Sequence, residues 1–239
     1  AIIVAESFEF GALKGLGSDQ VSALMPAQVA ALSSAQIAAL QPQGFGGSYP
    51  DSGANGFGGG ALSGLSPESM AVLTSAHLAG LGSAGIASLG EDQLAALSPG
   101  ALRGIPGNAV IGLSSMQLAM LSTDQTRALS GEQIANLTIG AIKGLGFDVS
   151  GSEGFILQQG LGVFSSVQIA ALNSAQIAAL ASEQVASIRP DSIRGLALDR
   201  VRALSTDQVA GLTSEQVRQL SDEQVGALGG VPNGYPGSG

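Results

Sequence analysis

The sequence contains no cysteine and only one histidine among its 239 residues. Without cysteine, the chain forms no disulfide and offers no thiolate nucleophile. A single histidine argues against a zinc site, because such sites combine several His and Cys ligands. His77 stands at a repeat position that is usually glutamine, and no nucleophile-elbow motif accompanies it. We therefore predict a structural role for His77, and neither a metal nor a cofactor.

Charge is also scarce, and basic residues are the scarcer kind. Only 11% of the residues are charged, with 9 basic against 18 acidic ones and a formal net charge of −9. Binding to nucleic acid or anionic lipid needs clustered Lys and Arg, so both partner classes are disfavoured. A mean hydropathy of +0.34 with so little charge favours a chain that hides surface in an assembly with itself.

Long uninterrupted apolar runs are missing too. The uncharged windows Val21–Pro50 and Gly154–Ser182 are broken every few residues by Ser, Gln, Gly or Pro, which excludes a membrane span there. The chain begins AIIVAESFEF, without Met and without a basic leader. This start is typical of an exported protein whose signal has been removed, and a trimmed chain would begin in the same way.

What the sequence does contain is an eight-residue repeat. An apolar anchor, here numbered position 0, recurs at Leu204, Leu212, Leu220 and Leu228. Position 1 is usually Ser or Thr, position 4 is most often Gln, and position 5 is almost always Val, Ile or Leu. A unit this short cannot enclose a core, so the copies must stack on one another as an array.

Each unit has the pattern of a helix start. Ser or Thr followed three residues later by Gln is a capping box, and the apolar positions 0 and 5 then form a hydrophobic staple. Acidic residues come early in the unit, such as Asp207, and basic ones late, such as Arg202. This order suits the dipole of a short helix.

Three architectures fit an octad repeat. In one continuous helix, each anchor would advance by about 80° around the axis, so the apolar stripe would spiral. A β-solenoid conflicts with the many Ala, Gln and Glu residues, which are poor strand formers. We therefore predict an all-α solenoid of very short capped helices, one per repeat, interrupted by two insertions rich in Gly and aromatics.

The phase of the repeat divides the chain into segments. We predict an N-terminal arm at 1–7, repeat runs at 8–40, 57–145 and 156–228, insertions at 41–56 and 146–155, and a Gly/Pro tail at 229–239. The aromatics gather in or beside the segments that are not repeat. Two roles are open for them: they plug the ends of each run, or they dock on a neighbouring subunit. The candidates for subunit contacts are Ile2, Ile3, Val4, Phe8, Phe10, Phe45, Tyr49, Phe147, Phe155 and Tyr235.

Other motifs give weak signals. Paired carboxylates such as Glu91 and Asp92 fall at predicted helix starts, where the dipole accounts for them. The stretch GFGGG at 56–60 lacks the lysine of a phosphate loop. Two pairs of oxygen-bearing side chains in the insertions, Asp148 with Glu153 and Asp51 with Asn55, do not complete a calcium loop. Asn136 begins a glycosylation sequon whose Thr138 is also an ordinary cap.

The repeat also resembles tracts in other proteins. The stretches LSSAQIAALQ at 32–41, NSAQIAALASEQV at 173–185 and STDQVAGLTSEQV at 205–217 are similar to octad tracts in large secreted and surface proteins of Gram-negative bacteria, often labelled adhesin-like or haemagglutinin-like. The resemblance covers about four fifths of the chain. It implies a secreted or cell-surface location and carries over no functional residue.

Together these features predict a structural protein. We expect an exported subunit that polymerises with itself into a filament, tube or surface layer. The alternative is an adhesin-type rod that binds a surface glycan or protein. An enzyme or a cytoplasmic scaffold is the least favoured class, because no catalytic constellation is visible.

Overall fold

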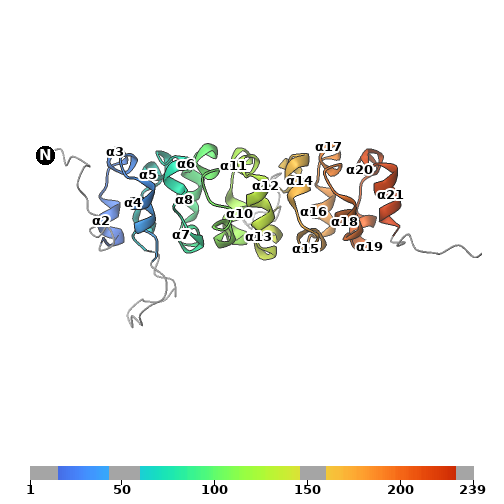
Figure 1. The fold of residues 1–239 in the computed structure, drawn as a ribbon, viewed down its shortest axis with the longest axis horizontal. Coiled ribbons are helices and arrows are strands. Elements are labelled where there is room, and N and C mark those ends of the chain that lie inside the picture. Colours follow the sequence, from blue (N-terminus) through green and yellow to red (C-terminus); the bar gives the residue numbers. More distant parts are fainter. Residues whose placement is uncertain (1–15, 43–59, 146–159, 230–239) are drawn as a thin grey trace, which may run out of the picture.

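The computed structural model describes residues 16–42, 60–145 and 160–229, and the description below is limited to them. In these ranges the chain is all-α, with short helices separated by brief extended links and no strand. The molecule is an elongated rod, with α2 (Ser18–Ser22) and α21 (Asp222–Leu228) at opposite ends (Figure 1). The predicted solenoid of very short helices is thus confirmed. No helix in the described part is long and apolar enough to cross a membrane.

Each described helix corresponds to one eight-residue unit. Those between α2 and α21 are α3 Pro26–Ala30, α4 Ser34–Ala39, η1 Ala61–Gly64, α5 Pro67–Ala71, α6 Ser75–Leu78, α7 Ser83–Ala87, α8 Glu91–Ala96, α9 Pro99–Leu102, η2 Val110–Gly112, α10 Ser115–Met120, α11 Thr123–Ala128, α12 Gly131–Asn136, α13 Ile139–Lys143, η3 Leu161–Val163, α14 Ser166–Ala171, α15 Ser174–Ala178, α16 Ser182–Ala186, α17 Pro190–Ile193, α18 Leu198–Arg202, α19 Thr206–Ala210 and α20 Ser214–Gln219.

The helices stack in three columns. Each packs on the helix three units earlier, for example α5 on α3, α9 on α6 and α20 on α17. Three eight-residue units therefore complete one turn of the coil, and the next turn lies directly on it. The spiralling apolar stripe that an octad would produce on one continuous helix does not arise here, because every unit starts a new helix.

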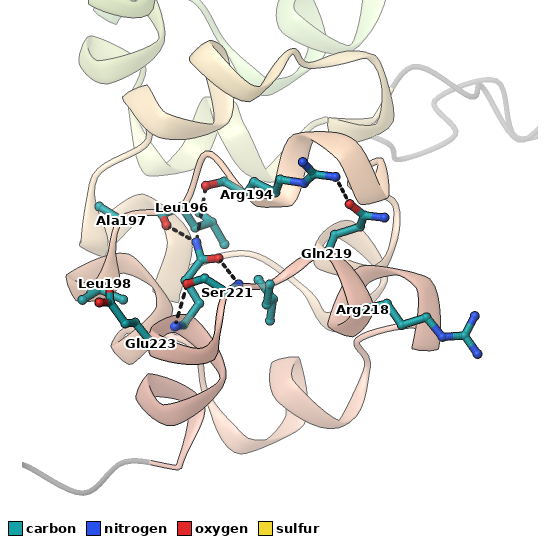
Figure 2. A pocket seen from close by; sticks show the side chains of 10 residues that line it. Arg194, Leu196, Ala197, Leu198, Arg218, Gln219, Ser221 and Glu223 are labelled. Carbon is teal, nitrogen blue, oxygen red and sulfur yellow. Dashed lines mark hydrogen bonds between the residues drawn. The ribbon is translucent and has the colours of Figure 1, made fainter.

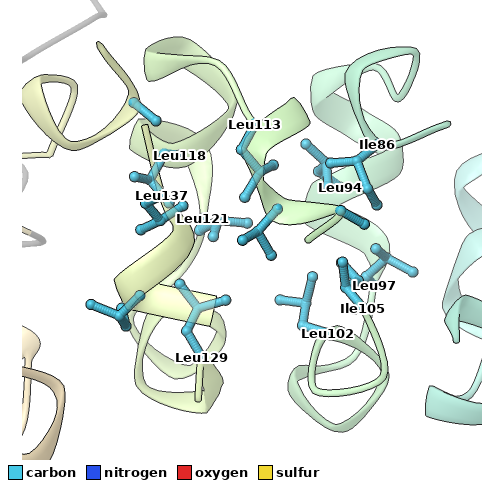
Figure 3. Close-up of a cluster of buried hydrophobic side chains, with 14 of the residues drawn as sticks. Ile86, Leu94, Leu97, Leu102, Ile105, Leu113, Leu118, Leu121, Leu129 and Leu137 are labelled. Carbon is cyan, nitrogen blue, oxygen red and sulfur yellow. The ribbon is translucent and has the colours of Figure 1, made fainter. Parts of the chain in front are cut away.

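The anchors and the position-5 residues form one core along the rod. Figure 3 shows Leu94 and Leu102 at position 5, with the anchors Leu97, Ile105 and Leu113, turned toward a shared interior. All five are at most 3% exposed. A helix of four to seven residues is unstable alone, whereas each fully buried Leu or Ile contributes about 1.5–3 kcal/mol. Stacking, and not helix propensity, holds the units.

The helix starts carry the predicted caps. At α11, the Ser122 hydroxyl accepts a hydrogen bond from the backbone N–H of Gln125 at 3.2 Å. The same arrangement recurs at α4, α10, α12, α14, α19, α20 and α21.

Removing one such cap tests how much each contributes. We expect Ser122→Ala to lower the free energy of unfolding by about 1 kcal/mol, because the N–H of Gln125 loses its side-chain acceptor. Urea unfolding followed by circular dichroism measures the change. An unchanged unfolding midpoint would show that backbone contacts alone fix this helix start.

The structure shows that two repeat units are split. Leu62 occupies the position-5 place of the unit that begins at Leu40, since η1 stacks on α2 and the N–H of Leu62 donates to the Leu40 carbonyl at 2.8 Å. In the same way, Leu161 in η3 completes the unit that begins at Leu145. The next anchors are Leu65 and Phe164, so each of the stretches 43–59 and 146–159, which lie outside the described residues, falls within a single unit in the sequence. The predicted anchors Phe57 and Ile156, like most of the predicted insertions, lie outside the described residues.

Candidate functional site

The most regular polar feature of the rod is the glutamine at position 4. Gln125, which is 2% exposed, shows its geometry. Its Oε1 accepts from the N–H of Ser122 at 2.8 Å, which closes the capping box. Its Nε2 donates to the carbonyls of Leu94 and Leu97, both at 2.8 Å, in the turn below. One side chain therefore caps its own helix and binds the previous turn.

The same bridge repeats along the coil, and we call this set the glutamine ladder. Its members donate to carbonyls 28 and 31 residues earlier, or 39 and 42 earlier across the second split unit. The described members with such bonds are Gln93, Gln117, Gln125, Gln133, Gln168, Gln176, Gln184, Gln208, Gln216 and Gln224. All of them are buried. The anchor carbonyls that would otherwise be buried without a partner are satisfied in this way.

The sequence predicted the cap but not the bridge to the next turn. One signal could have revealed it: no described unit has Glu at position 4, although Glu completes a capping box equally well and suits the helix dipole better. A carboxylate accepts hydrogen bonds but cannot donate them. Only the amide serves both ends, so the strict choice of Gln indicates a second, donating role.

Units without this glutamine approach each other more closely. Most of them carry Ala, Ser or Gly at position 4 and often Gly at position 7, as in Ala101 with Gly104 and Ser192 with Gly195. A Cβ added to Gly104 would lie 2.0 Å from the backbone oxygen of Ser75 in α6. Turns therefore meet in two ways, through a glutamine bridge or through direct backbone contact.

Ser69, Ser192 and Arg200 also stand at position 4 and donate to anchor carbonyls in place of the glutamine. The Ser192 hydroxyl donates to the Phe164 carbonyl at 2.8 Å, and Arg200 Nε donates to the Leu172 carbonyl at 3.1 Å. The Arg200 guanidinium also binds Asp199, and this hydrogen bond lowers the pKa of that exposed carboxyl. In these units the anchor carbonyl thus receives a donor although position 4 departs from the consensus.

His77 has the structural role that its repeat position predicts. Its Nδ1 accepts a hydrogen bond from the N–H of Thr74 at 3.1 Å, as the glutamine Oε1 does elsewhere. The described ranges contain no group of three or more His, Asp or Glu side chains close enough to share a metal ion. The capping role of His77 is confirmed.

A shallow hollow lies near the C-terminal end, between α18 and α21. Arg194, Leu196, Leu220 and Glu223 are among its lining residues (Figure 2). Gln224 fills part of its wall, donating to the Leu196 carbonyl at 2.6 Å, and the Arg194 guanidinium donates to Gln219. Gln219 and Gln224 are thus engaged in hydrogen bonds within the hollow, and Glu223 is the one carboxylate among its lining residues.

The two ends of the described coil differ from its interior. At the C-terminal end, the position-5 residues Val217 and Val225 are 40% and 44% exposed, whereas Val201 one turn earlier is 1% exposed. At the N-terminal end, the anchors Leu16 and Leu24 are only partly buried. The core is thus open at both ends of the described coil.

Comparison with known proteins identifies the repeat in the last third of the rod. The model of the ALTTAQ repeat family matches residues 160–189 and 193–229. This region is a repeat region of that kind. No curated protein and no solved structure matches the chain.

The matched segments agree with the observed units. They contain α14 to α16 and α18 to α21, and the position-4 glutamines of all these helices except α18 belong to the ladder. The family match covers less than a third of the chain, while the same contacts continue to α2. The repeat region is therefore longer in the structure than in the family match.

The contact residues predicted from the sequence cannot be placed. Ile2, Ile3, Val4, Phe8, Phe10, Phe45, Tyr49, Phe147, Phe155 and Tyr235 all lie outside the described residues, as do the two pairs of oxygen-bearing side chains in the insertions. Their docking role stays a prediction. Phe164, in contrast, is described and fully buried in the core as an anchor.

Proposed function

We propose that this chain is a structural subunit of an extracellular self-assembling polymer, a filament, tube or surface layer, and that it has no enzymatic role. The observation that carries the proposal is the open core at the ends of the described coil. Val217 and Val225 belong to the position-5 set that is buried in the interior turns, yet they reach the surface in the last turn.

Solenoids that remain monomeric usually close their ends with repeats whose outer face is polar. The last described units of this rod have the same sequence pattern as the interior ones, and their apolar residues are exposed. Two different end surfaces that bind each other form a heterologous contact, which does not close on itself and so builds a fibre. An extracellular location is supported by the resemblance to secreted octad tracts.

Assembly of the purified chain tests the proposal. At high concentration we expect species far larger than 23.5 kDa by light scattering, and fibres or sheets by negative-stain microscopy. A sharp monomer peak at every concentration would contradict it. Deleting residues 1–7 or 229–239 tests the separate prediction that the termini dock on neighbours; equal assembly by both truncated forms would refute that role.

Salt and pH should modulate this assembly. Each subunit carries a net charge of −9, and the isoelectric point is near 4.4. Repulsion between like-charged subunits is screened by salt and falls as carboxylates become protonated. We expect the critical concentration to fall as NaCl rises from 0.01 M to 0.15 M, and again as the pH is lowered from 7 toward 5. Sedimentation at each condition measures it, and a rise in either series would contradict the expectation.

A binding rod of adhesin type is the second candidate. Met116, Met120 and Ile139 are 45%, 37% and 43% exposed on α10 and α13, which are neighbours in one column. Apolar residues gathered on a flank favour a protein contact. Such a rod would bind its partner as a monomer, and replacing these three residues by Ser would abolish binding without altering the size of the protein.

A further inference from the structure

We propose that successive subunits join head to tail by continuing the glutamine ladder, with Gln20, Gln28 and Gln36 of one copy bound to the anchor carbonyls of Leu204, Leu212 and Leu220 of the next. This inference rests on the proposed polymer function and names its contact. The two surfaces are called the N-face, formed by α2, α3 and α4, and the C-face, formed by α19, α20 and α21.

The N-face carries donors without acceptors. Gln20, Gln28 and Gln36 each close the capping box of their own helix, with Oε1 bonds of 2.9, 2.9 and 2.7 Å. Their Nε2 groups donate to nothing among the described residues, in which α2, α3 and α4 form the first turn. Gln20 and Gln28 are exposed and Gln36 is half-buried, while the glutamines of the ladder are all buried. One turn of coil therefore presents three amides held in position by their caps.

The C-face carries the matching acceptors. In interior turns the anchor carbonyls receive a glutamine, as those of Leu180 and Ile188 do from Gln208 and Gln216 at 2.7 Å. The carbonyls of Leu204, Leu212 and Leu220 have no such donor in the described part of the chain. Donors and acceptors thus remain at opposite ends, three of each, with the spacing that the coil itself imposes.

The apolar parts of the two faces match as well. Inside the rod, the anchors and the position-5 residues of successive turns are buried together in one core. The N-face has the anchors Leu16, Leu24 and Leu32 only partly covered, and the C-face has Val217 and Val225 exposed. A second copy placed on the C-face would bury both sets in the same contact.

The complementarity of the two faces favours a second copy of the chain as the occupant, because the donors stand on one face and the acceptors on the other, three of each. A coil ends in a step and not in a flat ring. The N-face of one copy fits the C-face of another in only one orientation. This orientation places α2 on α19, α3 on α20 and α4 on α21.

A pair of face variants tests the contact. The N-face variant Gln20→Glu/Gln28→Glu/Gln36→Glu keeps the capping acceptors but replaces each donor by a charge that repels carbonyl oxygens. The C-face variant Val217→Glu/Val225→Glu changes two residues that are already exposed. We expect each variant alone to keep the wild-type circular dichroism and to remain monomeric at concentrations at which the wild type assembles, with the critical concentration raised about tenfold or more.

Mixing the two variants gives the decisive result. Each variant retains the face that the other has lost, so we expect a one-to-one dimer of twice 23.5 kDa and nothing larger by light scattering. The control Ser22→Glu/Ala27→Glu/Ala30→Glu adds as many charges at exposed flank positions of the same turn and should assemble as the wild type does. A mixture that stays monomeric would overturn the proposed contact.

The remaining outcomes separate this inference from the proposed function. If the wild type assembles and both face variants assemble equally well, the polymer stands and the head-to-tail contact is refuted. If the wild type is monomeric at all concentrations, the polymer function fails. Should a chain limited to residues 16–229 then assemble where the full chain does not, the terminal segments cover the faces, and a second copy is not their natural occupant.

Discussion

Replacing Gln125 by glutamate is expected to destabilise the rod by about 3–5 kcal/mol at neutral pH. The buried amide donates to two carbonyls of the turn below, at 2.8 Å each. A carboxylate in its place can still accept from Ser122, but it would face the carbonyls of Leu94 and Leu97 without a proton to share. The substitution therefore buries a charge and leaves the Leu97 carbonyl unpaired, while the Leu94 carbonyl keeps its hydrogen bond from the N–H of Leu97 at 3.1 Å.

The same substitution at Gln28 provides a matched control. Gln28 has the same position in its unit and the same capping bond, but its Nε2 has no acceptor in the described structure. Gln28→Glu should change the unfolding free energy by less than about 0.5 kcal/mol. The difference between the two variants, measured by urea unfolding of non-assembled protein, isolates the bond between turns from the cap.

The pH dependence of Gln125→Glu gives an independent readout. Burial disfavours the charged form, so the pKa of the introduced carboxyl will be raised in the folded state. The destabilisation should be largest above that pKa and should shrink as the pH falls through it, because the protonated carboxyl can donate one hydrogen bond. If the loss of unfolding free energy were equal at pH 7 and pH 5, or if Gln28→Glu caused the same loss, the role assigned to the ladder would be contradicted.

Gly104→Ala is expected to cost about 3 kcal/mol, at the upper end of overpacking effects. The added Cβ would lie 2.0 Å from the Ser75 oxygen, 2.4 Å from its Cα and 2.5 Å from its carbonyl carbon. All three are backbone atoms, which cannot move aside as a flexible side chain can. The turns that contain α6 and α9 would have to separate, and the core contacts between them would weaken.

Gly100→Ala is the control within the same unit. Gly100 lies inside α9, and the nearest atom to an added Cβ is the Ser98 Oγ at 3.9 Å. Because alanine favours a helix over glycine by about 0.5–1 kcal/mol, this variant should be slightly more stable than the wild type. Thermal unfolding of both variants checks the pair. If both substitutions shifted the melting temperature in the same direction, close approach between turns would not be what requires Gly104.

Most of the local structure could be predicted from the repeat. The Ser/Thr and Gln of each unit, such as Ser122 and Gln125, specify a capped helix start through contacts within four residues. The distribution of Asp207 and Arg202 within their units supports the same helix polarity. These features depend on neighbours along the chain, and the sequence contains all of those neighbours.

The partners of each unit could not be predicted in the same way. The octad pattern does not indicate that three units make a turn. Nor does it indicate that Gln125 binds Leu94 and Leu97, or that Leu40 and Leu65 are successive anchors. These are contacts between residues 25 to 42 positions apart, and they depend on the angle at which each short helix follows the last. The candidate end faces were missed for the same reason.

The sequence by itself determined the helical class, the length of each helix and its caps, because a cap is satisfied by atoms of its own unit. Only the tertiary structure decided which turn each unit lies on, and hence that the amide of Gln28 and the carbonyl of Leu212 are left without partners at opposite ends of the described rod. A hydrogen bond between turns forms only when the units have stacked into a coil. Which groups remain without a partner at the two ends of the described rod therefore depends on the coil and not on the repeat.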